Sequence, residues 1–186
     1  DNDELTGGAG ADTFNVDAGE DSIADLTTND VLKVSSGAKA NANNISNFVA
    51  TAATENAGTA NLYAGSGNAT IDVRLSSAGG YNIFSGSGTD TLKGSSKNDT
   101  ITILNAGEAD NDSIDGHSGD DILQLSSGAH TITTDGNLSG IETIKTHKGG
   151  SVTDFSNQTE NLIFIGNDGN DTLKGGTGND QLTGGS

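Results

Sequence analysis

The chain has 186 residues, which is enough for one domain or two small ones. Acidic residues outnumber basic ones by 26 to 8, so the basic face needed for electrostatic nucleic-acid binding is excluded. No apolar run approaches the ~20 residues of a membrane span, and the absence of cysteine excludes disulfides and thiolate metal sites. A net charge of −18 with 4% aromatic residues is typical of disorder unless something neutralises the acids.

A nine-residue step organises the chain from its first residues. Asp3, Asp12, Asp21 and Asp30 are nine residues apart, and an apolar residue stands two positions after each of them. The same Asp-x-apolar triplet recurs later in the chain at Asp90, Asp99, Asp112, Asp121, Asp171 and Asp180. Acids on a solvated Gly-rich linker would have no reason to keep phase with apolar residues, so the pattern favours a repeating fold. Three acids lie out of phase and are interpreted as ordinary surface residues: Asp72, Asp135 and Asp154.

These segments resemble the nonapeptide G-G-x-G-x-D-x-U-x of the RTX (repeats-in-toxin, hemolysin-type) calcium-binding proteins, of the surface-layer and adhesin kind. Residues 7–15 and 175–183 match it at every specified position, whereas residues 25–33 keep Asp30 and Leu32 but no glycine. The resemblance implies an all-β fold, a right-handed parallel β-roll or β-solenoid. The residue types agree with this, because glycine suits the tight turns and no proline interrupts the strand ladders.

The resemblance also implies that several Ca²⁺ ions are held between adjacent turns by aspartate carboxylates and turn carbonyls, hard oxygen ligands of the kind that Ca²⁺ prefers. The expected carboxylate ligands are the phased aspartates Asp3, Asp12, Asp21, Asp30, Asp90, Asp99, Asp112, Asp121, Asp171 and Asp180. The expected carbonyl ligands lie near Gly8, Gly10, Gly19, Gly86, Gly88, Gly119, Gly169, Gly176 and Gly178.

Residues 18 apart would lie on one edge of such a roll, one coil above the other. This spacing predicts the pairs Asp3/Asp21 and Asp12/Asp30. In the middle of the chain, one step between phased aspartates is 13 residues instead of nine, so about four residues must bulge out. With that bulge, the predicted pairs are Asp90/Asp112 and Asp99/Asp121. Same-edge partners for Asp171 and Asp180 are expected beyond residue 186.

Calcium blocks and spacers poor in phased aspartate alternate along the chain, and residues 12–38 align with residues 99–129 as a duplication. The predicted blocks are residues 1–33, 85–124 and 166–186, the last continuing into a following copy, and the spacers are residues 34–84 and 125–165. We expect the spacers to be metal-free β coils of the same solenoid, stabilised by apolar stacking. The least regular stretch, Asn43 to Asn61, is expected to be a protruding loop or a short helix.

The two ends of the chain join in phase. Read from end to start they give GGSDNDELT, a nonapeptide with only the second glycine replaced. The chain is then one period of a longer tandem array, or separate copies dock end to end with calcium at the joint, or the match is due to chance. The expected partners are therefore copies of itself, with cell-surface polysaccharide as a further candidate.

Catalysis finds little support in the residues. The histidines, His117, His130 and His147, lie in polar contexts where we expect them to be exposed, and no G-x-S-x-G motif is present. The chain is predicted to be no enzyme but a structural module of a secreted bacterial surface or matrix protein that folds and assembles on Ca²⁺. The alternative is a C-terminal folding and secretion appendage of a type I secreted exoenzyme, which an upstream catalytic domain would favour. A third reading, ice or polysaccharide binding on a flat face, depends on two Thr-Ile-Thr triplets at residues 100–102 and 131–133.

Overall fold

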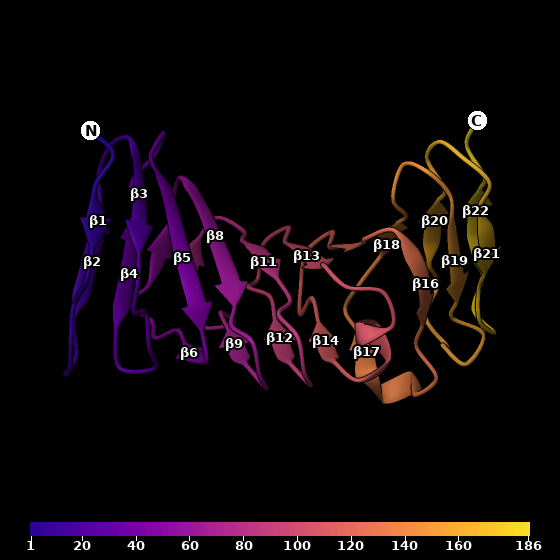
Figure 1. The fold of residues 1–186 in the computed structure, drawn as a ribbon, viewed down its shortest axis with the longest axis horizontal. Helices are drawn as coiled ribbons and strands as arrows, with labels where there is room; N and C mark the ends of the chain where they lie inside the picture. Colours follow the sequence, from indigo (N-terminus) through magenta and orange to yellow (C-terminus); the bar gives the residue numbers. More distant parts are fainter.

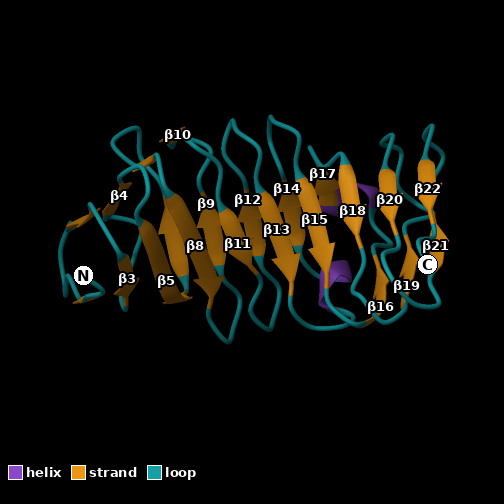
Figure 2. Ribbon diagram, turned by 90° about the horizontal axis from the view of Figure 1, so that it is seen from above, coloured by secondary structure: helices purple, strands orange, loops and turns teal.

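The computed structural model describes residues 1–186 as a parallel β-solenoid that progresses along one axis, with the two termini at opposite ends (Figure 1). One sheet of ten strands runs the length of the molecule, as the view in Figure 2 shows. Its strands, in order, are β1 (Glu4–Leu5), β3 (Glu20–Ile23), β5 (Lys39–Ile45), β8 (Thr59–Ala64), β11 (Asn82–Phe84), β13 (Thr100–Ile103), β15 (Ile122–Leu125), β18 (Thr143–Lys145), β20 (Ile163–Ile165) and β22 (Gln181–Thr183). The all-β solenoid expected from the repeats is thereby confirmed.

Three smaller parallel sheets cover the opposite side of the core. The first contains β2 (Thr13–Val16), β4 (Val31–Val34), β7 (Glu55–Asn56) and β10 (Ser77–Ala78). The second contains β6 (Asn47–Val49), β9 (Thr70–Asp72), β12 (Thr91–Lys93), β14 (Ser113–Asp115) and β17 (Leu138–Ser139), and the third β16 (Gly128–Thr131), β19 (Ser151–Asp154) and β21 (Thr172–Lys174). The only helices are the 3₁₀ turns η1 (Glu108–Asp110) and η2 (Asp135–Asn137), and neither has the length or apolar character to cross a bilayer.

Strand register shows how long each coil is. Glu4 pairs with Ser22, Asn82 with Thr100 and Ile163 with Gln181, so coils at the nonapeptide segments advance by 18 residues. The step from β13 to β15 is 22 residues, from Thr100 to Ile122, and η1 lies within the extra length. The bulge of about four residues predicted in the middle of the chain is confirmed.

A single column of apolar side chains fills the solenoid, and 32 buried residues form one continuous cluster. Strands such as Val31–Val34 and Thr100–Ile103 alternate half-buried and buried positions, because successive side chains of a strand point to opposite faces. In the ten-stranded sheet, register stacks one inward residue from each coil: Leu5, Ile23, Ala42, Leu62, Ile83, Ile101, Leu123, Ile144, Phe164 and Leu182. Each coil thus buries its apolar residues mainly against its two neighbours.

The strands of residues 34–84 form coils of the same solenoid, and their outer face carries a ladder of side chains. The Nδ2 atom of Asn82 donates to Oδ1 of Asn61 at 2.8 Å, and Nδ2 of Asn61 donates to Oδ1 of Asn41 at 2.8 Å. Beside this ladder the rings of Tyr63 and Phe84 stack with centroids 4.4 Å apart. Amide and aromatic stacking therefore joins apolar packing in holding these coils together.

Two expectations from the sequence are wrong. The stretch from Asn43 to Asn61 is neither a protruding loop nor a helix but continues through β5, β6, β7 and β8, because buried Ile45 and Phe48 wrap it around the core. His130 is fully buried instead of exposed, since β16 turns it inward opposite Thr153, and its Nε2 atom lies 3.1 Å from the carbonyl oxygen of Ser126.

Candidate metal centre

The phased aspartates lie along the two edges of the solenoid. The chain leaves the ten-stranded sheet at one edge, here named the exit edge, with turns such as 85–90 and 104–112. It returns to that sheet at the opposite edge, the return edge, with turns such as 94–99 and 116–121. Strand register places the members of each predicted pair on adjacent coils, with Asp12/Asp30 and Asp90/Asp112 on the exit edge and Asp3/Asp21 and Asp99/Asp121 on the return edge.

Within each pair, the carboxylate of the later residue accepts a hydrogen bond from the backbone of the earlier one. The N–H of Asp99 donates to Oδ1 of Asp121 at 2.6 Å, and the N–H of Asp90 donates to Oδ1 of Asp112 at 2.8 Å. The corresponding bonds of the pairs Asp3/Asp21 and Asp12/Asp30 are both 3.0 Å. One oxygen of each later carboxylate is therefore fixed against the preceding coil.

Asp171 and Asp180 make the same backward contact without an acidic partner on the preceding coil. Oδ1 of Asp171 accepts from the N–H of Ser151 at 2.9 Å, and Oδ1 of Asp180 accepts from the N–H of Leu162 at 2.9 Å. Their role as ligands, together with acidic partners beyond residue 186, stays a prediction.

The second carboxylate oxygen faces a glycine five residues earlier in the same turn. A Cβ on Gly94 would stand 2.7 Å from Oδ2 of Asp99, and one on Gly116 would stand 2.7 Å from Oδ2 of Asp121. The same arrangement occurs in three further turns, at Gly7/Asp12, Gly166/Asp171 and Gly175/Asp180. The first glycine of the nonapeptide is thus required because its missing side chain makes room for the aspartate oxygen.

Four of the phased aspartates have an Oδ2 atom that is buried without a hydrogen-bond donor: Asp12, Asp112, Asp121 and Asp171. A buried oxygen of this kind is costly unless a donor or cation satisfies it. No group of three or more histidine, aspartate or glutamate side chains converges anywhere in the fold. A cation at these turns would therefore be held by no more than two carboxylates together with backbone carbonyls, an all-oxygen set that suits Ca²⁺.

The electrostatics at the middle pairs also favours a cation. Burial, followed by repulsion from Asp99 and Glu142, raises the pKa of Asp121 to about 7. Burial, followed by repulsion from Asp90 and Glu108, raises the pKa of Asp112 to about 6. A divalent ion would remove this penalty on the charged carboxylates, so the residues present fit calcium.

The predicted carbonyl ligands lie in turns that only glycine can form. Positive φ angles occur at Gly8, Gly10, Gly19, Gly88, Gly119 and Gly169. At Gly86, Gly176 and Gly178 the reason is different, because a Cβ would stand 1.8 to 1.9 Å from a carbonyl oxygen of the preceding coil. The turns are therefore built for close approach of successive backbones, and the assignment of individual carbonyls to calcium stays a prediction.

One turn of the first spacer is a degenerate repeat that the sequence reading did not single out. Gly65-Ser66-Gly67 precedes Gly86-Ser87-Gly88 by 21 residues, and this recurrence was the available signal. Ala69 stands where the later turn has Asp90, and its N–H donates to Oδ1 of Asp90 at 2.8 Å.

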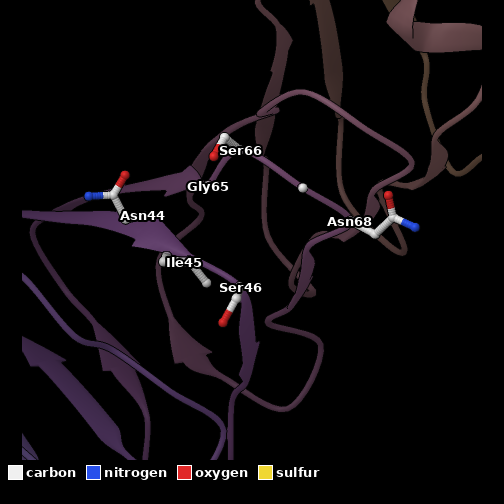
Figure 3. Close-up of a pocket in the computed structure, with 7 residues that line it drawn as sticks. Asn44, Ile45, Ser46, Gly65, Ser66 and Asn68 are labelled. Carbon is white, nitrogen blue, oxygen red and sulfur yellow. The ribbon is translucent and has the colours of Figure 1, made fainter.

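Figure 3 shows the hollow beside this turn, of about 330 Å³, lined mainly by the neutral side chains and backbone of Asn44, Ile45, Ser46, Gly65, Ser66, Gly67 and Asn68. No carboxylate lines it, so the row of acids on the exit edge is interrupted here.

The acids that lie out of phase have other contacts. Asp72 forms an ion pair with Arg74 at 2.7 Å, and Asp154 forms one with Lys174 at 2.8 Å. Oδ1 of Asp135 accepts from the N–H of Thr159 at 2.9 Å. These contacts account for the three acids as surface residues.

The metal-free fold is expected to become more stable when the pH is lowered from 8 to 5. The raised pKa values of Asp112 and Asp121 mean that the folded chain binds more protons than the unfolded chain between about pH 4 and pH 7, so the free energy of unfolding falls as pH rises through this window. Far-ultraviolet circular dichroism in chelator at several pH values would measure the fraction of the chain that is folded, which should increase as the pH is lowered. An Asp121→Asn variant should show a weaker dependence, and a folded fraction that is flat or rises with pH would contradict the expectation.

A sequence model of the RTX calcium-binding nonapeptide repeat matches the chain in four copies, at residues 1–23, 84–102, 106–129 and 163–186. These segments contain nine of the ten phased aspartates, and Asp30 alone lies outside them. Neither the search of curated proteins nor the search of solved structures gives a match.

Proposed function

This chain is an RTX calcium-binding repeat protein, and we propose that it is a calcium-dependent structural module of a secreted extracellular surface or matrix protein. RTX nonapeptide repeats bind Ca²⁺, and RTX repeat proteins are typically exported by type I secretion. In the proposed function the chain stays unfolded at low cytosolic calcium and folds into the solenoid outside the cell.

The observation that carries the proposal is the stacking of buried aspartate pairs on adjacent coils. Asp90, Asp99, Asp112 and Asp121 are each 1% exposed, although the chain has a net charge of −18. Burying like charges next to one another is unfavourable unless a cation joins them, and such a fold gains its stability from metal binding. Calcium then acts as the condition for folding rather than as a catalytic group.

The continuity of the fold favours a structural role over the role of a folding appendage of an enzyme. The ten-stranded sheet runs through both spacers and all calcium blocks, so stiffening at the blocks would be transmitted along one rod. Coils that stack only on their neighbours suit one-dimensional extension. No catalytic role is proposed for any residue of the chain.

The proposed module stacks with further copies of itself. The strands β1 and β22 each have a neighbour on one side only, and Leu182 in β22 is 47% exposed. Such strand edges and apolar ends favour the addition of further coils.

Small-angle scattering and electron microscopy of the purified chain, with and without millimolar Ca²⁺, would test the proposed function. Ten coils at the ~4.8 Å strand spacing predict a rod unit about 50 Å long with calcium. An unfolded chain of this length is expected to have a radius of gyration of about 45 Å without calcium. Filaments formed only with calcium would support assembly. Monodisperse rods at every calcium level and concentration would contradict calcium-dependent folding and assembly.

A further inference from the structure

Glu142 lies outside every nonapeptide and every matched repeat segment, yet its side chain continues the row of carboxylates on the return edge. Oε2 of Glu142 accepts a hydrogen bond from the N–H of Asp121 at 2.7 Å. One coil earlier, Oδ1 of Asp121 accepts from the N–H of Asp99 at 2.6 Å. The carboxylate of Glu142 thus accepts a hydrogen bond from the backbone of Asp121, just as the carboxylate of Asp121 accepts one from the backbone of Asp99.

The backbone around Glu142 repeats the arrangement of the preceding pair. A Cβ on Gly94 would stand 2.7 Å from Oδ2 of Asp99 and 2.5 Å from the carbonyl oxygen of Gly116. A Cβ on Gly116 would stand 2.7 Å from Oδ2 of Asp121 and 1.9 Å from the carbonyl oxygen of Gly140. In both places a glycine leaves space where an aspartate oxygen and a carbonyl of the next coil face each other.

The two aspartate oxygens differ in their hydrogen bonds, and the one beside Gly116 lacks a donor. Oδ2 of Asp99 accepts hydrogen bonds from the N–H and hydroxyl groups of Ser95, at 2.6 and 3.0 Å. Oδ2 of Asp121 is buried and has no donor, and Asp121 as a whole is 1% exposed. The buried oxygen of Asp121 and the carbonyl oxygen of Gly140 therefore lie close together without a positive group, and the carboxylate of Glu142 is held against the backbone N–H of the same Asp121.

We propose that Glu142 is a calcium ligand, so that a Ca²⁺ site lies between turn 116–121 and turn 140–142 and extends the row of ions on the return edge into the second spacer. The inference rests on the proposed function, since it assumes that the chain binds calcium. The turn at residues 140–142 is three residues shorter than turn 116–121, yet strand register places Glu142 beside Asp121 on the next coil.

Such an ion would relieve the repulsion between acidic residues on successive coils. Strand register places Asp99, Asp121 and Glu142 one after another along the return edge. A glutamate that only capped the N–H of Asp121 could be replaced by glutamine, whose amide oxygen accepts the same hydrogen bond. The negative charge is the feature that a cation needs and a cap does not.

Calcium titration of the Glu142→Gln variant would test the proposal, with Glu160→Gln as the matched control in the same spacer. Isothermal titration calorimetry and native mass spectrometry would give the number of bound ions. We expect one Ca²⁺ fewer in Glu142→Gln than in the unmodified chain, the same number in Glu160→Gln, and retained β-sheet circular dichroism in both. Equal stoichiometry and affinities in the two variants would overturn the proposal.

A measurement on the unmodified chain keeps the test independent of variant folding. The ¹³C resonance of the Glu142 side-chain carboxyl should shift during calcium titration together with that of Asp121, while the carboxyl of Glu160 should not. A Glu142 carboxyl that does not respond would refute the site. If the unmodified chain bound no calcium at all, the proposed function itself would fail, a result distinct from loss of this one site.

Discussion

In excess EDTA at neutral pH, the chain is expected to lose its β-sheet circular dichroism and to regain it on addition of millimolar Ca²⁺. Without a cation, the paired carboxylates of Asp90, Asp99, Asp112 and Asp121 would have to stay charged in buried turns or take up protons. The apolar core is narrow, since most coils contribute only a few small or medium side chains to it. The free energy gained by burying these side chains is therefore too small to offset both this repulsion and the conformational entropy of a Gly-rich chain.

Far-ultraviolet circular dichroism during a calcium titration would give the midpoint and steepness of the transition. Mg²⁺ at the same concentration is the matched control, because its strict octahedral preference and slow dehydration make it bind poorly at backbone-rich sites. It should restore little of the signal. Unchanged β-structure in excess chelator would contradict metal-coupled folding.

Gly94→Ala is expected to destabilise the calcium-loaded fold by about 3 kcal/mol, at the upper end of the cost of overpacking. The added methyl would stand 2.5 Å from the carbonyl oxygen of Gly116 and 2.7 Å from Oδ2 of Asp99, so it would push adjacent coils apart at a predicted calcium turn. The φ angle of Gly94 is not positive, so the expected cost is steric and not conformational. Calcium affinity should fall as well, since the same atoms are displaced.

Gly67→Ala is the matched control for this substitution. Gly67 lies in the degenerate turn on the exit edge, and a Cβ there would have no atom within 4 Å. Its effect should stay within about 0.5 kcal/mol. Urea unfolding of both variants in millimolar Ca²⁺ would measure the difference, and equal midpoints would show that the coils can separate at Gly94 without loss.

The register of the coils at the nonapeptide segments could be predicted from the sequence because their period is constant. With two nonapeptides per coil, counting 18 residues identifies the neighbour of each aspartate, and the register Glu4–Ser22 follows the count. Even the bulge before Asp112 could be predicted, since the nine-residue phase resumes after it and the duplicated segment shows where the extra residues lie.

The spacers could not be predicted in the same detail because their coil lengths vary. The asparagine ladder joins Asn41 to Asn61 over 20 residues and Asn61 to Asn82 over 21, so no fixed count reveals it. Glu142 follows Asp121 by 21 residues through a shortened turn, which hides its place in the row of carboxylates. The inward orientation of His130 likewise depends on the turn between β15 and β16, because that turn determines the residue at which β16 begins.

By itself, the sequence determined that the chain is a Gly-rich, acidic β-solenoid and which aspartates face one another, because a strict period converts residue number directly into position along an edge. The tertiary structure alone decided how the spacer coils close and which residues outside the period join those edges. The physical reason is that the number of residues in each turn of the spacer coils depends on how inward side chains such as Ile45 and Phe48 pack. That packing is determined by contacts with the coils on either side.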